Sequence, residues 1–480
     1  MSRSTSIACA TANQLATGAA LEISRAGGSA VDSAMAAHAV ICVTMPYAAG
    51  LGGDLMMLVD DGNRASAVTG SGRSALVPNQ SSDAGASVTV PGLVSGWDIA
   101  HESWGRLDPA NILEPAIRLA RDGFRVDDAL AGAVASQRPR LESHGAAEWA
   151  LLGCTAGETW RQPELARLLE SLATDGFESF YRGSIATAIV AAAARHGSTL
   201  SMSDFAEHHA SMSEPITTPW GTGTLSVQPP PSQGVLLSLA ATWADRHVDL
   251  ISENPSARQH LLVEATESSF EFRSDVIASG ESLLEVELEV DSNVARRRGG
   301  PRGYVHTAGV AIATTDTVVS SLVSVFDDFG SCVFVPELGI TLNNRGDGFT
   351  DGSNRYRPGS FPVHTLAPVI VRDGDGSVLA LATPGADGQV QTLLQVVSAM
   401  RFDGTPLPGA IAAPRWRSEN GALLIEQSHS ASSDLESRGH EIVVREDGDA
   451  IFGAVVAAGN GPPGLIYGAD DRRSVVGATE

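Results

Sequence analysis

The arrangement in the sequence best suited to chemistry is a threonine placed between a flexible segment and a strand. Residues 296–303 (RRRGGPRG) combine glycines, proline and charge, and this composition predicts an exposed loop. His306 and Thr307 follow directly, and an apolar run typical of a buried strand begins after them. A threonine hydroxyl there could become a nucleophile if the chain were cut before it, although many threonines begin strands for packing reasons alone.

Several other kinds of catalytic group are missing from the sequence. All 32 basic residues are arginines, so a Walker A loop, a pyridoxal phosphate Schiff base and an SxxK serine hydrolase are excluded. There is no GxSxG motif, and the adjacent pair His208 and His209 has no HExxH pattern around it. The four cysteines are scattered, which argues against disulfides and a structural zinc site. We therefore expect no cofactor and no metal.

The elements that would hold such a threonine can be predicted from periodicity. Residues 15–26 show helical spacing and end at Gly27 and Gly28, and Ser29 can cap a second helix from Ala30 to about Met45. That second helix is apolar on all sides, so we expect it inside the protein. Further helices are expected at residues 108–130, 163–173 and 184–196. Strands are expected at 308–313 and 318–326, which would form a hairpin, and at 366–371 and 378–383.

Composition limits the partners and the location. The 480 residues are 43% hydrophobic, enough for a large core, and the formal charge of −24 makes nucleic acid a poor partner because phosphate backbones need basic surfaces. No stretch reaches the roughly 18 apolar residues of a membrane span, and the N-terminus lacks the apolar core of a signal peptide. We expect a cytoplasmic protein that binds neither nucleic acid nor membrane.

From residue 8 to residue 474 the sequence resembles the gamma-glutamyltransferase family. The resemblance depends on nine short motifs, none of which is decisive alone. The order and spacing of these motifs along the chain make a chance similarity very improbable. The motifs are residues 26–34 (AGGSAVDSA), 50–54 (GLGGD), 89–97 (TVPGLVSGW), 180–186 (FYRGSIA), 229–234 (PPPSQG), 339–344 (GITLNN), 383–385 (TPG), 413–415 (APR) and 468–472 (GADDR). Residues 70–73 (GSGR) and 357–366 (RPGSFPVHTL) resemble the acylase-like cytoplasmic branch of that family.

The resemblance implies a fold and a mode of maturation. The expected fold is α/β, the four-layer αββα sandwich of N-terminal-nucleophile hydrolases. One intertwined unit would be formed by an N-terminal segment, residues 1–306, and a C-terminal segment, residues 307–480. Self-cleavage between His306 and Thr307 would leave the two halves associated, with a homodimer as a further option. The expected partner is a small-molecule amide or acyl compound.

The resemblance also assigns catalytic roles. Thr307 would be the nucleophile, and its freed α-amine, with a pKa near 8, would be the general base. An alignment of this chain with the family without a gap places the family's catalytic threonine at His306. A gap of one residue in the turn at residues 314–317 places it at Thr307 instead. Ser324 occupies the position at which the family has a hydroxyl residue beside the nucleophile. An ordinary polar strand residue is an equally good interpretation of Ser324. Gly385 and Ala386 match the residues whose N–H groups form the oxyanion hole.

The residues that hold a glutamyl donor in the transferases proper are largely replaced here. The family arginine falls on Ser71, two residues before Arg73, and the family aspartate falls on Gly348, next to Asp347. The family's serine pair becomes His364 and Thr365. Arg73, Arg345 and His364 could rebuild a different carboxylate site, although Arg73 could equally brace its loop. Since a desolvated ionic contact contributes several kcal/mol, we expect a substrate other than glutathione, with water as acceptor.

Two alternatives stay open. One is a true gamma-glutamyl hydrolase or transferase that acts on glutathione-like donors through a rearranged clamp. The other is an unprocessed, non-catalytic homologue that keeps the fold for binding. The main prediction is an autoprocessing N-terminal threonine hydrolase that cleaves an amide or related acyl bond.

Overall fold

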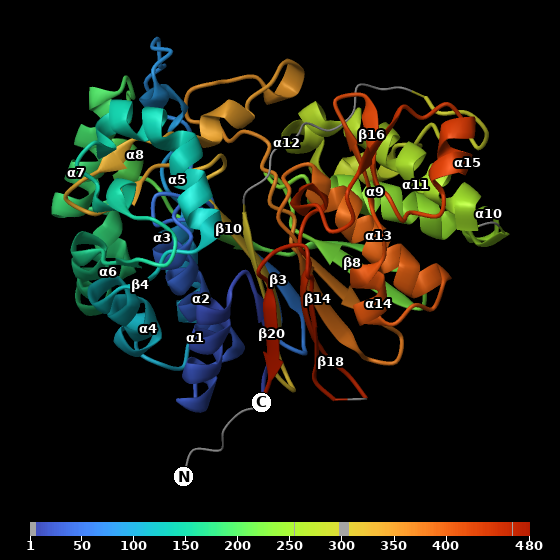
Figure 1. Ribbon diagram of the computed structural model, residues 1–480, viewed down its shortest axis with the longest axis horizontal. Helices are drawn as coiled ribbons and strands as arrows, with labels where there is room; N and C mark the ends of the chain where they lie inside the picture. The colour runs from blue at the N-terminus through green and yellow to red at the C-terminus, as the bar shows by residue number, and fades with distance from the viewer. Residues whose placement is uncertain (1–5, 254, 297–306, 463) are drawn as a thin grey trace.

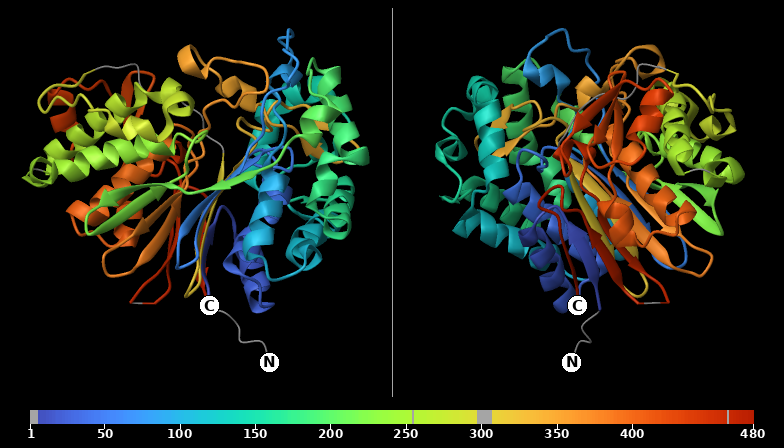
Figure 2. Two further views of the ribbon diagram at one scale, coloured as in Figure 1. Left: turned by 180° about the vertical axis from the view of Figure 1, so that it is seen from behind. Right: turned by 45° about the vertical axis from the view of Figure 1, so that its right-hand side comes forward.

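The computed structural model describes residues 6–253, 255–296, 307–462 and 464–480, and these form four layers. Two β-sheets pack face to face in the centre, and helices cover the outer face of each sheet (Figure 1). Both views in Figure 2 show the same order of helix, sheet, sheet and helix. The predicted four-layer αββα sandwich is confirmed.

The first sheet contains β9, the strand that directly follows Thr307. In the described residues its strands are, in order across the sheet, β20 (Val476–Thr479), β1 (Ala8–Thr11), β9 (Ala308–Ala313), β10 (Val318–Ser324), β2 (Asp54–Asp60), β3 (Ala65–Gly70) and β6 (Ser211–Ser213). Every neighbouring pair is antiparallel. One sheet therefore contains strands from before and after residue 307, and β9 and β10 lie between β1 and β2.

The second sheet packs against the first, and its strands are also antiparallel. Its strands are, in order, β19 (Ile466–Ala469), β18 (Val456–Asn460), β14 (Val378–Ala382), β13 (Val369–Arg372), β8 (Gly223–Val227) and β7 (Ile216–Trp220). Small side chains, among them Ala311, Ala380 and Ala458, fill the space between the two sheets. Ser320 of β10 joins the sheets, because its hydroxyl donates to Leu381 O at 2.7 Å and accepts from Val369 N at 3.2 Å.

The helices separate into two groups. Those over the first sheet are α1 (Gln14–Arg25), α2 (Ala30–Thr44), α3 (Leu93–Trp104), α4 (Pro109–Asp122), α5 (Asp128–Leu141), α6 (Pro163–Asp175), α7 (Gly183–Arg195) and α8 (Met202–Ala206). Those on the side of the second sheet are α9 (Gly234–Arg246), α10 (Val248–Glu253), α11 (Pro255–Phe270), α12 (Val276–Ser279), α13 (Gly388–Phe402), α14 (Leu407–Ala412) and α15 (Ser432–Ser437).

Shorter strands lie outside the two central sheets. They are β4 (Phe124–Arg125) with β5 (Thr159–Trp160), β11 (Phe334–Val335) with β12 (Ile340–Thr341), and β15 (Trp416–Glu419) with β16 (Ala422–Glu426) and β17 (Ile442–Arg445). Among the described helices none is both long and apolar enough to cross a membrane.

Local sequence explains the helix at the centre of the first layer. Ser29 accepts a hydrogen bond from Asp32 N, and the Asp32 carboxylate accepts from Ser29 N, so a capping box begins α2. Every residue of α2 is buried, which confirms the prediction of an internal helix. The glycine stop after the first predicted helix is also confirmed, since α1 ends at Arg25.

Three predicted elements have different boundaries in the structure. The strand expected at residues 366–371 runs from Val369 to Arg372. The helix expected at residues 108–130 is two helices, because Gly123 adopts φ of +93° and ends α4 at Asp122. The second strand of the hairpin was expected to reach Phe326 but ends at Ser324. Phe326 has φ of +86°, which a strand does not accommodate, and its N–H donates to the Ser324 hydroxyl at 2.9 Å.

Candidate active site

Thr307 lies at the start of β9, and its side chain meets a second hydroxyl. It is 5% exposed, and its Oγ1 lies 3.4 Å from Ser324 Oγ on the neighbouring strand β10. The pairing of Ala308 with Val323 holds the two strands in this register. His306, the other half of the expected cleavage site, lies outside the described residues. The hairpin therefore brings together the two hydroxyls that the family resemblance singled out.

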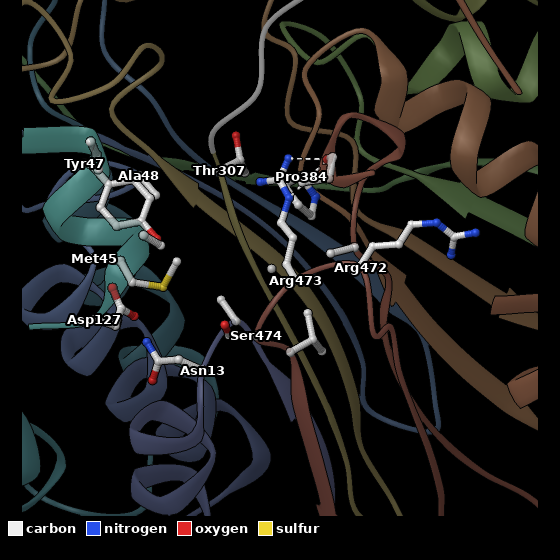
Figure 3. Close-up of a pocket in the computed structure, with 18 of the residues that line it drawn as sticks. Asn13, Met45, Tyr47, Ala48, Asp127, Thr307, Pro384, Arg472, Arg473 and Ser474 are labelled. Carbon is white, nitrogen blue, oxygen red and sulfur yellow. Dashed lines mark hydrogen bonds between the residues drawn. The ribbon is translucent and has the colours of Figure 1, made fainter. Parts of the chain in front are cut away.

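A cavity of about 540 Å³ opens onto Thr307. Its walls come from distant parts of the chain, as Figure 3 shows: helix ends from the first layer on one side, and the loops around Pro384 and Arg473 on the other. The polar residues that line it include Asn13, Tyr47, Asp127, Asp328 and Arg473. A cavity of this size fits a small organic substrate.

Arg473 places a positive charge in the same cavity as Thr307 (Figure 3). Its Nη2 donates to Ala450 O at 2.8 Å, which fixes the guanidinium group. Burial lowers the pKa of Arg473 to about 10, so the group is still protonated at neutral pH. Burial raises the pKa of the nearby Tyr47, whose hydroxyl is therefore neutral. The cavity thus combines a cation with carboxylates and neutral donors.

The loop that holds Gly385 and Ala386 connects β14 to α13. Gly385 has φ of +125° and Ala386 has φ of +50°, two left-handed conformations in succession, and the second is uncommon for a residue with a Cβ. The carbonyl of Ala386 accepts a hydrogen bond from Gln233 Nε2 at 3.1 Å, and the same amide donates to Thr365 O at 3.0 Å. Gln233 belongs to the predicted loop at residues 229–234, which therefore braces this turn.

Behind Ser324 lies a fully buried cluster of charged and polar groups. Asp54 of β2 pairs with Ser324 across the sheet, so the two side chains lie on the same face. The Asp54 carboxylate accepts from Arg345 Nε at 2.8 Å and from His364 Nε2 at 3.2 Å. The Arg345 guanidinium also stacks on the Phe326 ring, 4.6 Å from its centroid. Arg345 and His364 are thus brought together, as the sequence suggested, but through an aspartate that it did not single out.

The protonation states in this cluster follow from its geometry. Leu366 N donates to His364 Nδ1, so the ring proton lies on Nε2 and points at Asp54. Burial and the neighbouring Arg345 lower the pKa of His364 to about 4, which keeps the ring neutral. Burial opposes ionisation of Asp54, but Arg345 and His364 together hold its pKa below the usual value. At neutral pH the cluster is a single ion pair with a neutral histidine.

The Arg345 side chain has unused hydrogen-bonding capacity. Its Nη1 and Nη2 are buried and have no hydrogen-bond partner within the described part of the chain, and the same is true of Asp54 Oδ1. Buried donors are nearly always bonded to protein, water or ligand, so these atoms mark a place where a further polar group is expected.

The structure places the remaining predicted residues elsewhere. Arg73 is exposed, donates to Gly359 O at 3.0 Å and stacks on Phe361, so it braces its loop. Asp347 accepts a hydrogen bond from Asn344 and lines a separate surface cavity. Neither lines the cavity at Thr307, and the fully buried Arg345 and His364 do not line it either. The backbone carbonyl of Thr365 accepts the hydrogen bond from Gln233 that braces the Gly385 turn.

Asp54, Tyr47 and Arg473 were missed by sequence reasoning. Asp54 ends the family motif at residues 50–54, to which no role was assigned, and Arg473 directly follows the last family motif. The signal that could have identified Asp54 is its position as the first residue of β2, opposite Ser324.

Fold and site together define an enzyme of the N-terminal-nucleophile hydrolase class. A sequence model of gamma-glutamyltranspeptidase matches residues 16–479. The chain belongs to the gamma-glutamyltranspeptidase family.

Individual relatives agree with this placement. The chain is 32% identical to the oxamate amidohydrolase proenzyme of Klebsiella pneumoniae subsp. pneumoniae over 96% of both chains. It is 29% identical to the glutathione hydrolase-like YwrD proenzyme of Bacillus subtilis over 93% of both. Among solved structures, the cephalosporin acylase from Bacillus halodurans superposes with a TM-score of 0.86 at 26% identity, covering 99% of this chain and 96% of the acylase.

Proposed function

We propose that this protein cleaves its own chain between His306 and Thr307 and then hydrolyses a small amide whose acyl part carries a negative group. The observation that carries the proposal is the 3.4 Å contact between Thr307 Oγ1 and Ser324 Oγ at the wall of a substrate-sized cavity. Similarity to relatives named as proenzymes supports the cleavage step.

In the precursor, Thr307 Oγ1 attacks the carbonyl carbon of His306, and the peptide C–N bond breaks as the hydroxyl proton passes to the nitrogen. The product is an ester between the two segments, which water hydrolyses to leave a carboxylate on His306 and a free amine on Thr307. That amine has an ordinary pKa near 8 and can take the proton of its own hydroxyl during catalysis. One residue then supplies both nucleophile and base.

Two further groups act on the same reaction. Ser324 orients the Thr307 hydroxyl, and its own oxygen is fixed by the N–H of Phe326 at 2.9 Å. The N–H groups of Gly385 and Ala386 hold the oxyanion that forms when the substrate carbonyl is attacked. The left-handed conformation of both residues supports this assignment, because successive turns of that kind direct backbone N–H groups outward.

The substrate is assigned from the charges around the nucleophile. We assign the negative group to Arg345, because two of its buried nitrogens lack partners among the described residues and Asp54 links it to the face of Ser324. Phe326, which stacks on Arg345, would have to move aside to admit the ligand. Arg473 adds a positive field inside the cavity. Oxamate, the substrate in the name of one relative, is a small amide with a carboxylate of this kind.

Intact mass under denaturing conditions tests the first half of the proposal. We expect two chains, the second beginning at Thr307, and a single uncut chain for Thr307→Ala. A wild-type protein that stays whole would favour the non-catalytic alternative.

A substrate panel tests the second half. Ammonia release from oxamate and from longer amides with a carboxylate is compared with turnover of a gamma-glutamyl anilide. Hydrolysis of the anilide alone would overturn the substrate assignment and favour the glutathione-type alternative. A cytoplasmic location and a homodimer stay predictions.

A further inference from the structure

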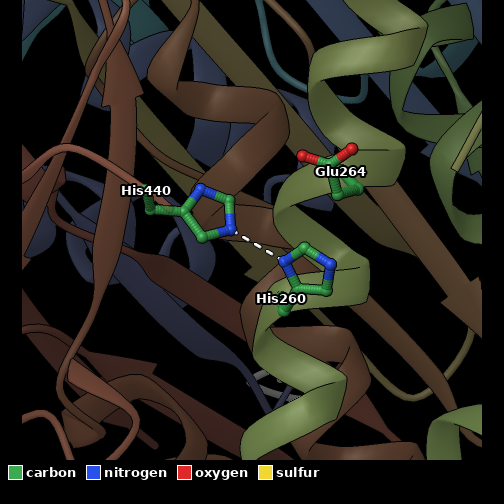
Figure 4. A group of neighbouring side chains, drawn as sticks. All are labelled: His260, Glu264 and His440. Atoms are coloured by element: carbon green, nitrogen blue, oxygen red, sulfur yellow. Dashed lines mark hydrogen bonds between the residues drawn. The ribbon is translucent and has the colours of Figure 1, made fainter. Parts of the chain in front are cut away.

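A second group of polar side chains lies in the outer layer, away from the cavity at Thr307. His260 and Glu264 belong to α11, and His440 precedes β17. Figure 4 shows the rings of His260 and His440 facing each other, with Glu264 further along the helix that holds His260. One nitrogen or oxygen from each lies within 4.8 Å of the others, and His260 and Glu264 are buried. Because residues four apart share a helix face, α11 presents both groups to the same point.

The hydrogen bonds fix which nitrogen of His260 faces this point. His260 Nε2 lies 2.8 Å from Asp291 O, and a carbonyl oxygen can only accept, so the ring proton lies on Nε2. Nδ1 therefore carries a lone pair, and it lies 2.8 Å from His440 Nε2. A histidine that donates one nitrogen to a backbone carbonyl while the other faces a cluster has the arrangement typical of metal ligands.

The surroundings suit a cation. The guanidinium of Arg438, the closest basic group in sequence to His440, is paired with Asp434 at 2.8 Å. Glu264 also accepts Arg296 N at 3.0 Å, which holds its carboxylate in place. A small cavity of about 20 Å³ reaches Glu264 and His440, which is about the space of one water molecule or ion.

We propose that His260 Nδ1, the Glu264 carboxylate and His440 Nε2 bind one Zn²⁺ ion. Two imidazoles and a carboxylate are ordinary zinc ligands, and bonds of about 2.0–2.2 Å in a tetrahedron separate the ligand atoms by about 3.3 Å. The two ring nitrogens need to move apart by only about half an ångström from the present 2.8 Å. A water molecule would take the fourth position of the tetrahedron. None of the three residues lines the cavity at Thr307, so the proposed ion lies apart from that cavity.

The position of the site gives it a role in the cleaved protein. Two ligands precede Thr307 in the chain and one follows it. If the proposed self-cleavage occurs, the ion joins the two resulting chains. Zinc binding itself does not depend on cleavage, so Thr307→Ala is expected to bind zinc as wild type does, which keeps the two proposals separable.

The test uses the full-length protein. After dialysis against a chelator and titration with ZnCl₂, elemental analysis is expected to find about one zinc per chain, with a melting temperature several degrees higher than that of the chelated protein. His440→Gln and Glu264→Gln are expected to keep below about a tenth of an equivalent under the same conditions. His247→Gln is the matched control, because His247 is an exposed histidine on another helix end.

Retention of zinc by His440→Gln at the wild-type level would overturn the proposal, and so would a wild-type protein that takes up none. In either case the contact between His260 and His440 is only a hydrogen bond. Should the variants fail to fold, Co²⁺ in the wild-type protein gives an independent result. A tetrahedral site produces intense visible absorption that Zn²⁺ displaces, and its absence would also overturn the assignment.

Discussion

Buried charged groups form one cluster around Asp54 and another around Asp470, and the two differ in how completely their guanidinium groups are bonded. Arg345 contacts Asp54 through Nε alone, and its two terminal nitrogens have no partner in the described residues. In the second cluster Arg472 uses all three nitrogens, on Glu426, Asp470 and two carbonyls. Arg415 bonds Phe452 O, Ile411 O and Asp470, which leaves only Nε.

We infer from this difference that the Asp470 cluster is a structural network, although Arg472 also lines the cavity at Thr307, and that the Asp54 cluster receives a ligand. A buried ion pair stabilises a fold only when its remaining hydrogen-bonding positions are also filled, as they nearly are around Asp470. Unfilled positions in a buried cluster keep a cost in the free protein that a bound ligand removes. We therefore expect substitutions around Asp470 to act on stability and those around Asp54 to act on catalysis.

The largest effect is expected for Asp470→Asn. It neutralises Asp470, which forms an ion pair with the Arg415 guanidinium, so this buried cation loses the carboxylate that is bonded to it. We expect the free energy of unfolding to fall by about 3–5 kcal/mol, measured by urea denaturation. The kcat of the protein that stays folded should be unchanged. A large loss of kcat with full stability would contradict the comparison.

Arg345→Gln is expected to lower catalysis more than stability, the opposite of Asp470→Asn. We expect kcat/KM for the anionic amide to fall about 100-fold, equivalent to about 2.7 kcal/mol of transition-state stabilisation. A double variant with Asp54→Asn removes the leftover buried charge and should restore stability without restoring activity. Recovery of activity in the double variant would show that Arg345 acts only through folding.

The pH dependence of stability distinguishes the clusters further. In the unfolded chain His364 has its usual pKa of 6.5 and becomes protonated below that pH. In the folded protein its pKa is about 4, so the ring stays neutral until the pH approaches 4. The stability from this group is thus complete above pH 6.5 and is lost as the pH falls toward 4. His364→Asn should reduce that loss by about 1.4 kcal/mol per pH unit, measured by denaturation from pH 7 to 4.5. An unchanged slope would contradict a neutral His364.

Two serines of β10 give the smallest and most closely matched pair of effects. Ser320→Ala leaves Val369 N and Leu381 O without their partner, so stability should fall by about 1 kcal/mol while kcat stays constant. Ser324→Ala should lower kcat about tenfold with a smaller change in stability. Substrate kinetics and thermal melts on both variants measure this. Equal effects on kcat would remove the special role of Ser324.

The parts that sequence could predict are those encoded locally. The hairpin that follows Thr307 and the capped helix α2 each depend on contiguous residues, whereas Gly385 and Ala386 were assigned through the family resemblance. The cluster around Asp54 depends instead on the register of β2 against β10 and on the contact between Asp54 and Arg345, which are 291 residues apart in sequence. The His260 and His440 pair is 180 residues apart, so no spacing rule could reveal it. Arg73 resembled a binding residue in type, but its side chain faces Gly359 and Phe361.

The position of β9 between β1 and β10 has a consequence for the lifetime of the protein. Strands from before residue 307 flank the hairpin of β9 and β10 on both sides, as β1 and β2. Two chains interleaved in this way cannot exchange partners or dissociate on dilution without tearing apart the central sheet. A nicked molecule would therefore age, melt and be degraded as a single polypeptide does, and its activity per molecule would not depend on concentration.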